Sequence, residues 1–249
     1  MPRATQTRHS LDVHARVRRG YFECRYGQLH VHNAMPPGGG FEESTPLLCL
    51  HDCPGSGRVF AEFLALAGRD RSVYAPDLPG FGESDPPTAG VAIADYAAAL
   101  GDFLDSMRLR QVDVLGQRTG SLIAVELALT RPAQIGRVVI VSAPLLTDSE
   151  RQAARRAPAP SPFDGLCRSP EWARWAADAA DHYPLRERLA RLTQRVLVLR
   201  PRDELWEATA RVRDAQPAAR LVDVDEPATG LFAASAARVA DTVREFLRR

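Results

Sequence analysis

Short apolar runs alternate with longer stretches of helical periodicity along most of the chain. Residues 21–33 alternate polar and apolar side chains like a β-hairpin, with Tyr26 and Gly27 near its turn. Short apolar runs then lie at 47–50, 72–74, 112–115, 138–141, 196–199 and 221–224. Helical stretches lie at about 58–68, 92–106, 120–131, 205–214 and 236–248. Strands that alternate with helices in this way predict βαβ units, a mostly parallel sheet and the α/β fold class.

One long segment interrupts this alternation. Between Val141 and Val196 the sequence shows no clear strand pattern. A helix is predicted to begin at Ser169, because serine is a favoured N-cap, Pro170 suits the first helical position and an acid follows in the first turn. This helix carries Trp172 and Trp175.

We interpret residues 146–190, approximately, as a small lid inserted into one domain that spans 21–249. A surface excursion whose two tryptophans pack on the body is the alternative. Residues 1–20 are interpreted as a flexible tail, since they lack the apolar stretch of a secretory signal. The chain contains no run of about 18 apolar residues, so no membrane span is expected.

The composition excludes several classes of reaction and of partner. The 249 residues are 45% hydrophobic and 25% charged, which supports a sizeable core. A net charge of +1 gives no reason to expect a nucleic-acid partner. Lysine is absent from the sequence, which excludes Schiff-base chemistry, covalent pyridoxal phosphate and a P-loop.

The cysteines bear on metal binding and on the cellular compartment. The four cysteines show neither CxxC spacing nor a neighbouring histidine cluster, so we expect no zinc site and no disulfide framework. Reduced thiols are typical of a cytoplasmic protein. The sequence therefore predicts a cytoplasmic protein with a small-molecule ligand and without metal or cofactor, and it leaves the oligomeric state open.

Three segments carry a family resemblance. They are residues 47–57 (LLCLHDCPGSG), 74–85 (YAPDLPGFGESD) and 112–132 (VDVLGQRTGSLIAVELALTRP). In this order and spacing they resemble the α/β-hydrolase fold superfamily, over roughly residues 20–249. The resemblance implies a mostly parallel central sheet flanked by helices, with a small inserted lid. It also implies that the turn after the first of these strands supplies an amide to an oxyanion hole.

The oxyanion turn departs from the family pattern. Asp52 stands where glycine is usual, and Cys53 holds the position of the amide donor. The resemblance gives His51 the role of bracing this turn through hydrogen bonds. It also makes the amide of Thr119 the second donor of the oxyanion hole.

The nucleophile elbow departs further. The family pattern G-x-S-x-G reads Gly116-Gln117-Arg118-Thr119-Gly120 here. Both glycines remain, so the tight turn from strand to helix can still form. The central residue is Arg118, which stays protonated and has no lone pair with which to attack. An acyl-enzyme of the serine type cannot form at this position.

The remaining members of the triad are altered as well. The family's histidine position falls on Thr229, and no histidine follows His182 in the sequence. The position of the acid falls on Glu204, with Asp203 beside it, and the register is open by one residue. The sequence therefore predicts a degenerate triad that retains only its carboxylate.

Other nucleophiles carry weaker arguments. Arg118 could lower the pKa of the Cys53 thiol, although a small buried hydrophobe is the favoured interpretation of this cysteine. Ser56, Ser121 and Ser142 lack an obvious base. His182, within the lid segment, is interpreted as a surface residue.

Arg118 has two interpretations of equal weight. Its guanidinium could anchor a carboxylate or phosphate beside the oxyanion hole, or it could pair with Glu204 and fill the space of the missing histidine. Three functions follow. The first is a repurposed enzyme that polarises a small carbonyl or carboxylate compound, with Glu204 or Asp203 as its base. The second is a non-catalytic protein that binds a ligand or partner. The third is a hydrolase with a non-serine mechanism.

Overall fold

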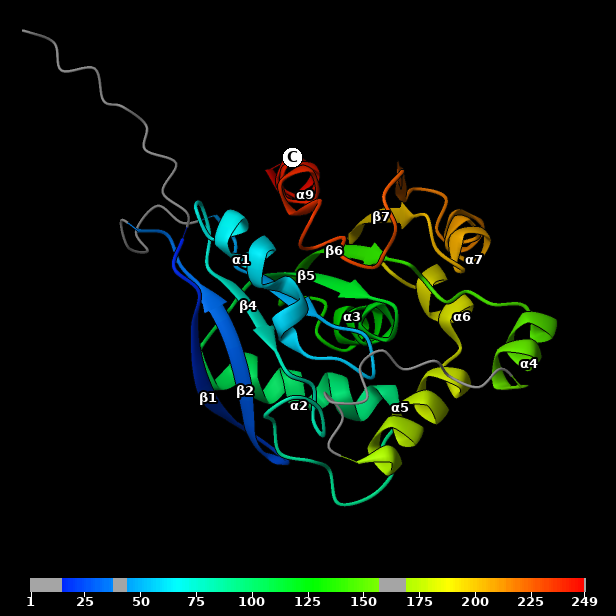
Figure 1. Ribbon diagram of the computed structural model, residues 1–249, viewed down its shortest axis with the longest axis horizontal. Helices are drawn as coiled ribbons and strands as arrows, with labels where there is room; N and C mark the ends of the chain where they lie inside the picture. The colour runs from blue at the N-terminus through cyan, green and yellow to red at the C-terminus, as the bar shows by residue number, and fades with distance from the viewer. Residues whose placement is uncertain (1–14, 38–43, 157–168, 249) are drawn as a thin grey trace, which may run out of the picture.

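A single eight-stranded sheet forms the centre of the protein in the computed structural model, which describes residues 15–37, 44–156 and 169–248 (Figure 1). In chain order the strands are β1 (Arg18–Cys24), β2 (Gly27–Ala34), β3 (Leu47–Leu50), β4 (Val73–Pro76), β5 (Val112–Gln117), β6 (Ile135–Val141), β7 (Arg195–Pro201) and β8 (Arg220–Val224). They lie side by side in the order β1-β2-β4-β3-β5-β6-β7-β8. The pairs β1–β2 and β2–β4 are antiparallel and all other pairs are parallel, so the predicted α/β class is confirmed.

Two layers of helices bury both faces of this sheet. On one face lie α1 (Ala61–Ala67) and α9 (Ala236–Arg248), packed together beside β3 and β4. On the other lie α2 (Ile93–Ser106), α3 (Thr119–Thr130), α5 (Pro170–His182) and α6 (Leu185–Ala190). Strand β3 has a uniformly apolar sequence because both of its faces are buried. Leu47 and Cys49 face the first layer, whereas Leu48 and Leu50 face the second.

Shorter helices complete the chain. They are the 3₁₀ turn η2 (Gly57–Phe60), α4 (Asp148–Arg156), α7 (Trp206–Ala210) and α8 (Val212–Ala215). The helix predicted at 58–68 is therefore a 3₁₀ turn followed by α1, and the one predicted at 205–214 is two short helices. The predicted N-cap is confirmed, because the Ser169 hydroxyl accepts a hydrogen bond from the Glu171 amide.

The tail and the lid segment differ in part from their predictions. Residues 18–20 belong to β1 rather than to a tail, and residues 1–14 lie outside the described residues. The lid segment contains α4, α5 and α6, of which only α5 was expected from the sequence. No helix in the described ranges is both long and apolar enough to cross a lipid bilayer.

Candidate functional site

The turn between β5 and α3 has the geometry that the two elbow glycines predict. Arg118 adopts φ 50° and ψ −113°, a conformation that side-chain-bearing residues adopt only when the surrounding structure imposes it. A Cβ on Gly116 would lie 2.2 Å from the Gly120 carbonyl oxygen, and one on Gly120 would lie 2.1 Å from the Leu50 carbonyl oxygen. Only glycine fits at both positions, so the turn presents the side chain of residue 118 at the carboxyl edge of the sheet.

The Arg118 guanidinium pairs with both predicted acids. Its Nη1 donates to Glu204 Oε1 at 2.5 Å, and its Nη2 donates to Asp203 Oδ2 at 3.1 Å. The two acids differ in their surroundings, since the Asp203 side chain is 5% exposed and that of Glu204 is 69% exposed. Of the two interpretations of Arg118, the structure contains the pairing with Glu204, and both carboxylates that the open register allowed reach the guanidinium.

The Asp52 carboxylate accepts hydrogen bonds from the turns on both sides of the site. Its Oδ1 accepts hydrogen bonds from the Cys53 amide at 2.8 Å, from the Thr119 amide at 3.2 Å and from the Thr119 hydroxyl at 2.9 Å. These are the two amides that the family resemblance assigns to the oxyanion hole. The sequence marks Asp52 as a departure from glycine, but its pattern did not predict this contact. The sequence did contain one signal for it: the carboxylate of Asp52 directly precedes an amide of the oxyanion hole, which needs an acceptor.

The site contains more negative than positive charge. Three carboxylates surround one guanidinium, with Asp52 Oδ2 lying 3.9 Å from Arg118 Nε. Loss of water contact raises the pKa of Asp52, although its side chain remains 34% exposed and Arg118 opposes the shift. The hydrogen bond from Arg118 lowers the pKa of Glu204. Burial would lower the pKa of Arg118, but the hydrogen bond to Glu204 and the neighbouring charges raise it on balance.

His51 has the bracing role that was predicted for it. Its Nδ1 donates to the Asp52 carbonyl oxygen at 2.6 Å, and its Nε2 accepts from the Leu78 amide at 2.9 Å. A ring with one donating and one accepting nitrogen is neutral. Burial favours the same form, since it lowers the pKa of His51. His51 is therefore committed to holding the oxyanion turn and is not available as a general base.

Three predicted site residues form no hydrogen bond or ion pair with Arg118 within the described residues. Thr229 is exposed in the loop between β8 and α9, and within the described residues no hydrogen bond joins it to Arg118 or the acids. Trp172 and Trp175 of α5 lie against the loop between β4 and α2. A Cβ on Gly80 would lie 3.5 Å from Trp172, and one on Gly90 would lie 3.4 Å from Trp175.

The alternative nucleophiles have structural surroundings. Cys53 is partly buried and packs against the hydrophobic core, as the favoured interpretation predicted. The Ser121 hydroxyl donates to the Arg118 carbonyl oxygen at 2.5 Å. Ser142 is fully buried at the end of β6 with φ 52°, and its hydroxyl has no hydrogen-bond partner among the described residues. Neither serine hydroxyl is bonded to a carboxylate or an imidazole, so neither is activated for attack.

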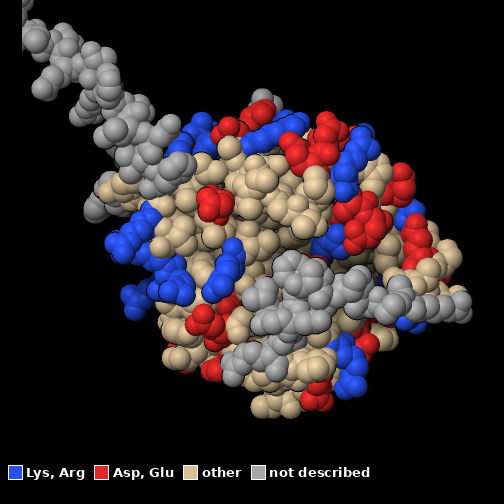
Figure 2. All heavy atoms as spheres, in the orientation of Figure 1, with Lys and Arg blue, Asp and Glu red and all other residues tan. Residues whose placement is uncertain are grey.

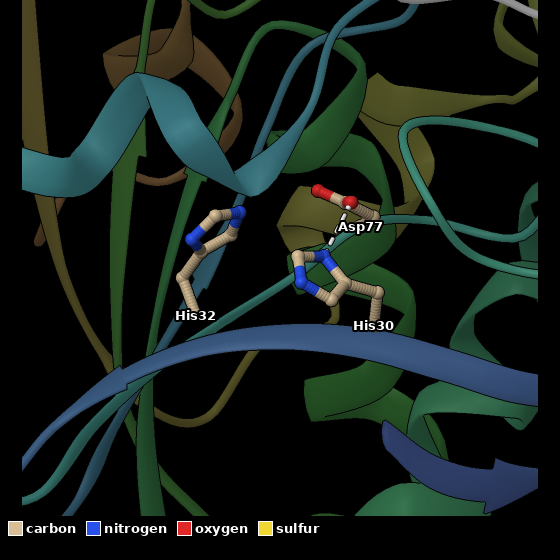
Figure 3. Close-up of side chains that lie close together, drawn as sticks. All are labelled: His30, His32 and Asp77. Atoms are coloured by element: carbon tan, nitrogen blue, oxygen red, sulfur yellow. Dashed lines mark hydrogen bonds and ion pairs between the residues drawn. The ribbon is translucent and has the colours of Figure 1, made fainter. Parts of the chain in front are cut away.

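A second polar cluster lies under the β1–β2 hairpin (Figure 3). Donor atoms of His30, His32 and Asp77 lie within 4.8 Å of one another, and all three side chains are buried. The Asp77 carboxylate already accepts from His30 Nδ1 at 2.9 Å, from the Gly57 amide at 2.6 Å and from the Glu83 amide at 2.9 Å. Because these bonds join the hairpin, η2 and the loop after β4, we assign the cluster a structural role.

Comparison with known proteins places the chain in a family. The family described as "alpha/beta hydrolase fold" matches residues 45–228. A proline iminopeptidase of Heyndrickxia coagulans is 27% identical over 145 residues, which cover 56% of this chain and 49% of that protein. A haloalkane dehalogenase of Mycolicibacterium paratuberculosis is 30% identical over 149 residues, which cover 57% of this chain and 45% of that protein. The matched part therefore spans about half the length of these curated relatives.

Solved structures agree on the fold. The enol-lactonase from Burkholderia xenovorans LB400 has a TM-score of 0.76 and 16% identity, over 92% of this chain and all of that chain. An esterase from Thermogutta terrifontis has a TM-score of 0.72 and 17% identity, over 93% of this chain and 98% of that chain. Since the family match spans well over half of the sequence and the sheet has the expected order, the chain belongs to the α/β-hydrolase fold family.

Proposed function

We propose that this member of the family binds a small molecule at the carboxyl edge of its sheet without forming an acyl-enzyme. On this proposal it is a non-catalytic binding protein with a degenerate triad. The residue types support it, because position 118 carries a guanidinium and no histidine follows His182 in the sequence. Attack and proton transfer both lack the groups that serine hydrolases use for them.

The position of the Asp52 carboxylate is the observation that carries the proposal. A tetrahedral intermediate needs amide donors aimed at its oxyanion. Here Asp52 Oδ1 accepts from the amides of both Cys53 and Thr119 and from the Thr119 hydroxyl. A substrate oxyanion would have to displace a like-charged carboxylate that is held by three hydrogen bonds. This arrangement favours binding over acyl transfer.

The same charges indicate which ligands the site favours. Arg118 is held by Glu204 and Asp203, and the exposed polar groups that remain are carboxylate oxygens of Asp52 and Glu204. Such oxygens accept hydrogen bonds and attract positive charge. The site therefore favours ligands that donate hydrogen bonds, in place of the small carboxylates that the identity of Arg118 alone suggested.

Labelling with a fluorophosphonate probe tests the proposal. We expect the natural chain to remain unlabelled and to hydrolyse aryl esters no faster than an unrelated protein does. As a positive control, the triple variant Asp52→Gly, Arg118→Ser, Thr229→His frees the amides and restores the missing groups, and it should gain labelling at position 118. Rapid stoichiometric labelling of the natural chain at any serine would contradict the proposal.

One observation favours a second candidate, an enzyme that transfers protons. Asp52 has one oxygen fixed by amides and the other accessible beside Arg118, and its pKa is raised. A carboxylate of this kind is suited to act as a general base, with Arg118 stabilising the resulting anion. A turnover that Asp52→Asn abolishes and Glu204→Gln leaves intact would support this candidate over the binding protein.

The segment between β6 and β7 completes the proposal. Helices α4, α5 and α6 form the connection between β6 and β7. These are the two strands that follow the elbow strand β5 in the sheet. We propose that this segment is a lid that limits access to the site. Deleting α4 (Asp148–Arg156), none of whose described residues belongs to the hydrophobic core, tests this role, which predicts faster ligand exchange while the sheet keeps its fold.

A further inference from the structure

A pocket of about 470 Å³ lies between the start of α2 and the corner where α5 meets α6. This volume is typical of small-molecule sites. Val91, Ile93 and Pro184 provide apolar walls, and Trp175 contributes an aromatic ring. Among the described residues that line it, none belongs to the cluster around Arg118. The pocket is therefore distinct from the site at the carboxyl edge of the sheet.

A buried carboxylate lies within this pocket. Glu126 comes from α3, and its side chain is only 5% exposed. Its Oε2 accepts a hydrogen bond from the Tyr183 hydroxyl at 2.9 Å and lies 3.7 Å from Arg188 Nε. Burial raises the pKa of Tyr183, so the phenol keeps its proton and donates. An acid so deeply buried in a helical layer is rare unless it is paired or serves a ligand.

The polar atoms that remain in the pocket are mostly acceptors. His182 Nδ1 donates to the Asp178 carbonyl oxygen at 2.7 Å, so Nε2 is the ring nitrogen that is left to accept from a ligand. The Asp178 carboxylate lines the pocket and forms no ion pair within the described residues. Glu126 Oε1 is a further acceptor. A ligand that complements these atoms must donate hydrogen bonds.

The charges around the pocket also favour a ligand that donates hydrogen bonds. Glu126 and Asp178 carry negative charge, and Arg188 carries the one fixed positive charge among the lining residues. The start of α2 would ordinarily favour an anion. Asp95 offsets this effect, because its carboxylate accepts from the Ala92 amide at 2.8 Å in the first turn of that helix. The net charge around the pocket is therefore negative.

We propose that this pocket binds an organic cation, a primary ammonium group on a small apolar body. The ammonium donates to Glu126, Asp178 and the Nε2 of His182, and the apolar body lies among Val91, Ile93 and Pro184. The Trp175 ring lines the same pocket, and tryptophan is the aromatic residue that attracts cations most strongly. The inference does not depend on the function proposed above for the Arg118 site.

Calorimetric titration of the full chain with three matched probes tests the proposal. Benzylammonium, benzyl alcohol and benzoate share a ring and differ in charge. We expect benzylammonium to bind more tightly than either of the others. Glu126→Gln should weaken it by about tenfold or more, because it removes a charge-assisted hydrogen bond while keeping an acceptor for Tyr183. Asp178→Asn, at an exposed position, should weaken it by a smaller factor.

Two control variants distinguish binding in this pocket from binding elsewhere on the protein. Glu171→Gln removes the same charge from α5 outside the pocket and should leave the affinity unchanged. Asp52→Asn alters only the Arg118 site and should also leave it unchanged. The proposal fails if benzylammonium binds no better than benzyl alcohol, or if binding survives both Glu126→Gln and Asp178→Asn. It also fails if Asp52→Asn abolishes binding, a result that would instead place the cation at the Arg118 site.

Discussion

Arg118 keeps the backbone conformation of the elbow while its side chain turns to two acids of very different exposure. Asp203 is nearly enclosed and also accepts from the Leu205 amide at 2.9 Å through Oδ1, whereas Glu204 is largely in solvent. Ion pairs in solvent contribute little, because water screens the charges and the side chains lose freedom. The structure therefore assigns most of the coupling at this residue to Asp203, although the hydrogen bond to Glu204 is the shorter one.

A double-mutant cycle checks this assignment. Arg118→Met leaves the Asp203 carboxylate buried without its partner, so we expect a loss of about 3 kcal/mol in the free energy of unfolding. Combined with Asp203→Asn, which keeps the bond to Leu205, the two changes should couple by about 1.5–3 kcal/mol in urea unfolding. Combined with Glu204→Gln, the coupling should stay below about 1 kcal/mol. Equal coupling to both acids would contradict the assignment.

Asp52 gives a second prediction for a single residue. Asp52→Gly should release the amides of Cys53 and Thr119 for a carboxylate from solution. In the variant, acetate at about ten times its dissociation constant should stabilise the fold by about 1.4 kcal/mol, seen as a rise in melting temperature. Asp52→Asn is the matched control, because its amide oxygen still fills the site. Similar stabilisation of the natural chain by acetate would show that Asp52 does not hold the amides firmly.

At the scale of elements, the turn from β7 to α7 sets the position of the two acids. Two guanidinium groups lie over the Trp206 ring, with Arg200 Cζ 3.8 Å and Arg202 Cζ 4.0 Å from the ring centroid. Arg200 is itself fixed by two hydrogen bonds of 2.8 Å to Asp223 of β8. This stack ties both ends of the turn to the sheet.

Trp206→Ala removes the stack and should loosen the turn. Cation–π contacts of this kind contribute about 0.5–1 kcal/mol each at partly exposed sites, so we expect a loss of about 1–2 kcal/mol in urea unfolding. The coupling between Arg118 and Asp203 should fall in the same variant. Trp206→Phe keeps an aromatic face and should retain part of both quantities. An undiminished coupling in Trp206→Ala would show that the turn is held by its backbone alone.

At the scale of the whole molecule, the sequence predicted the parts of the fold that depend on burial. Strand β3 and helix α9 have the predicted bounds, because their apolar side chains fill the core on the faces that the pattern assigns to them. Charged side chains lie over the outer surface of the same helical layers, as Figure 2 shows for one face. The hydrogen bond between Asp52 and the Thr119 amide could not be predicted from the sequence. It joins turns 67 residues apart and depends on a side-chain conformation that no local pattern encodes.

The pH dependence of global stability supplies a prediction at this scale. Asp113 of β5 is fully buried, and burial raises its pKa to about 6, although Arg71 and Arg137 lie 3.7 and 3.9 Å from its carboxylate oxygens and oppose the shift. Between the unfolded value of 3.8 and 6, the folded state binds more protons than the unfolded state. This group therefore lowers stability as the pH rises through that window, by about 3 kcal/mol in total.

Urea unfolding at pH 4 and pH 7 measures the effect. The stability of Asp113→Asn relative to the natural chain should increase by about 2.4 kcal/mol between these values, because the variant cannot ionise. Acids with a lowered pKa, such as Glu150, act in the opposite direction at lower pH and cancel in this comparison. A constant difference between the two proteins would show that Asp113 stays ionised throughout.

The carboxylate of Asp52 also bears on how this lineage can evolve. A serine gained at position 118 would meet amides that Asp52 already occupies, and a glycine gained at position 52 would free those amides beside a side chain that cannot attack. Neither step alone gives selection any esterase activity to favour. On the function proposed above, a gain of hydrolysis therefore requires several coincident substitutions, whereas changes that refine binding remain available one at a time. Descendants of this chain are expected to keep both residues together or lose both.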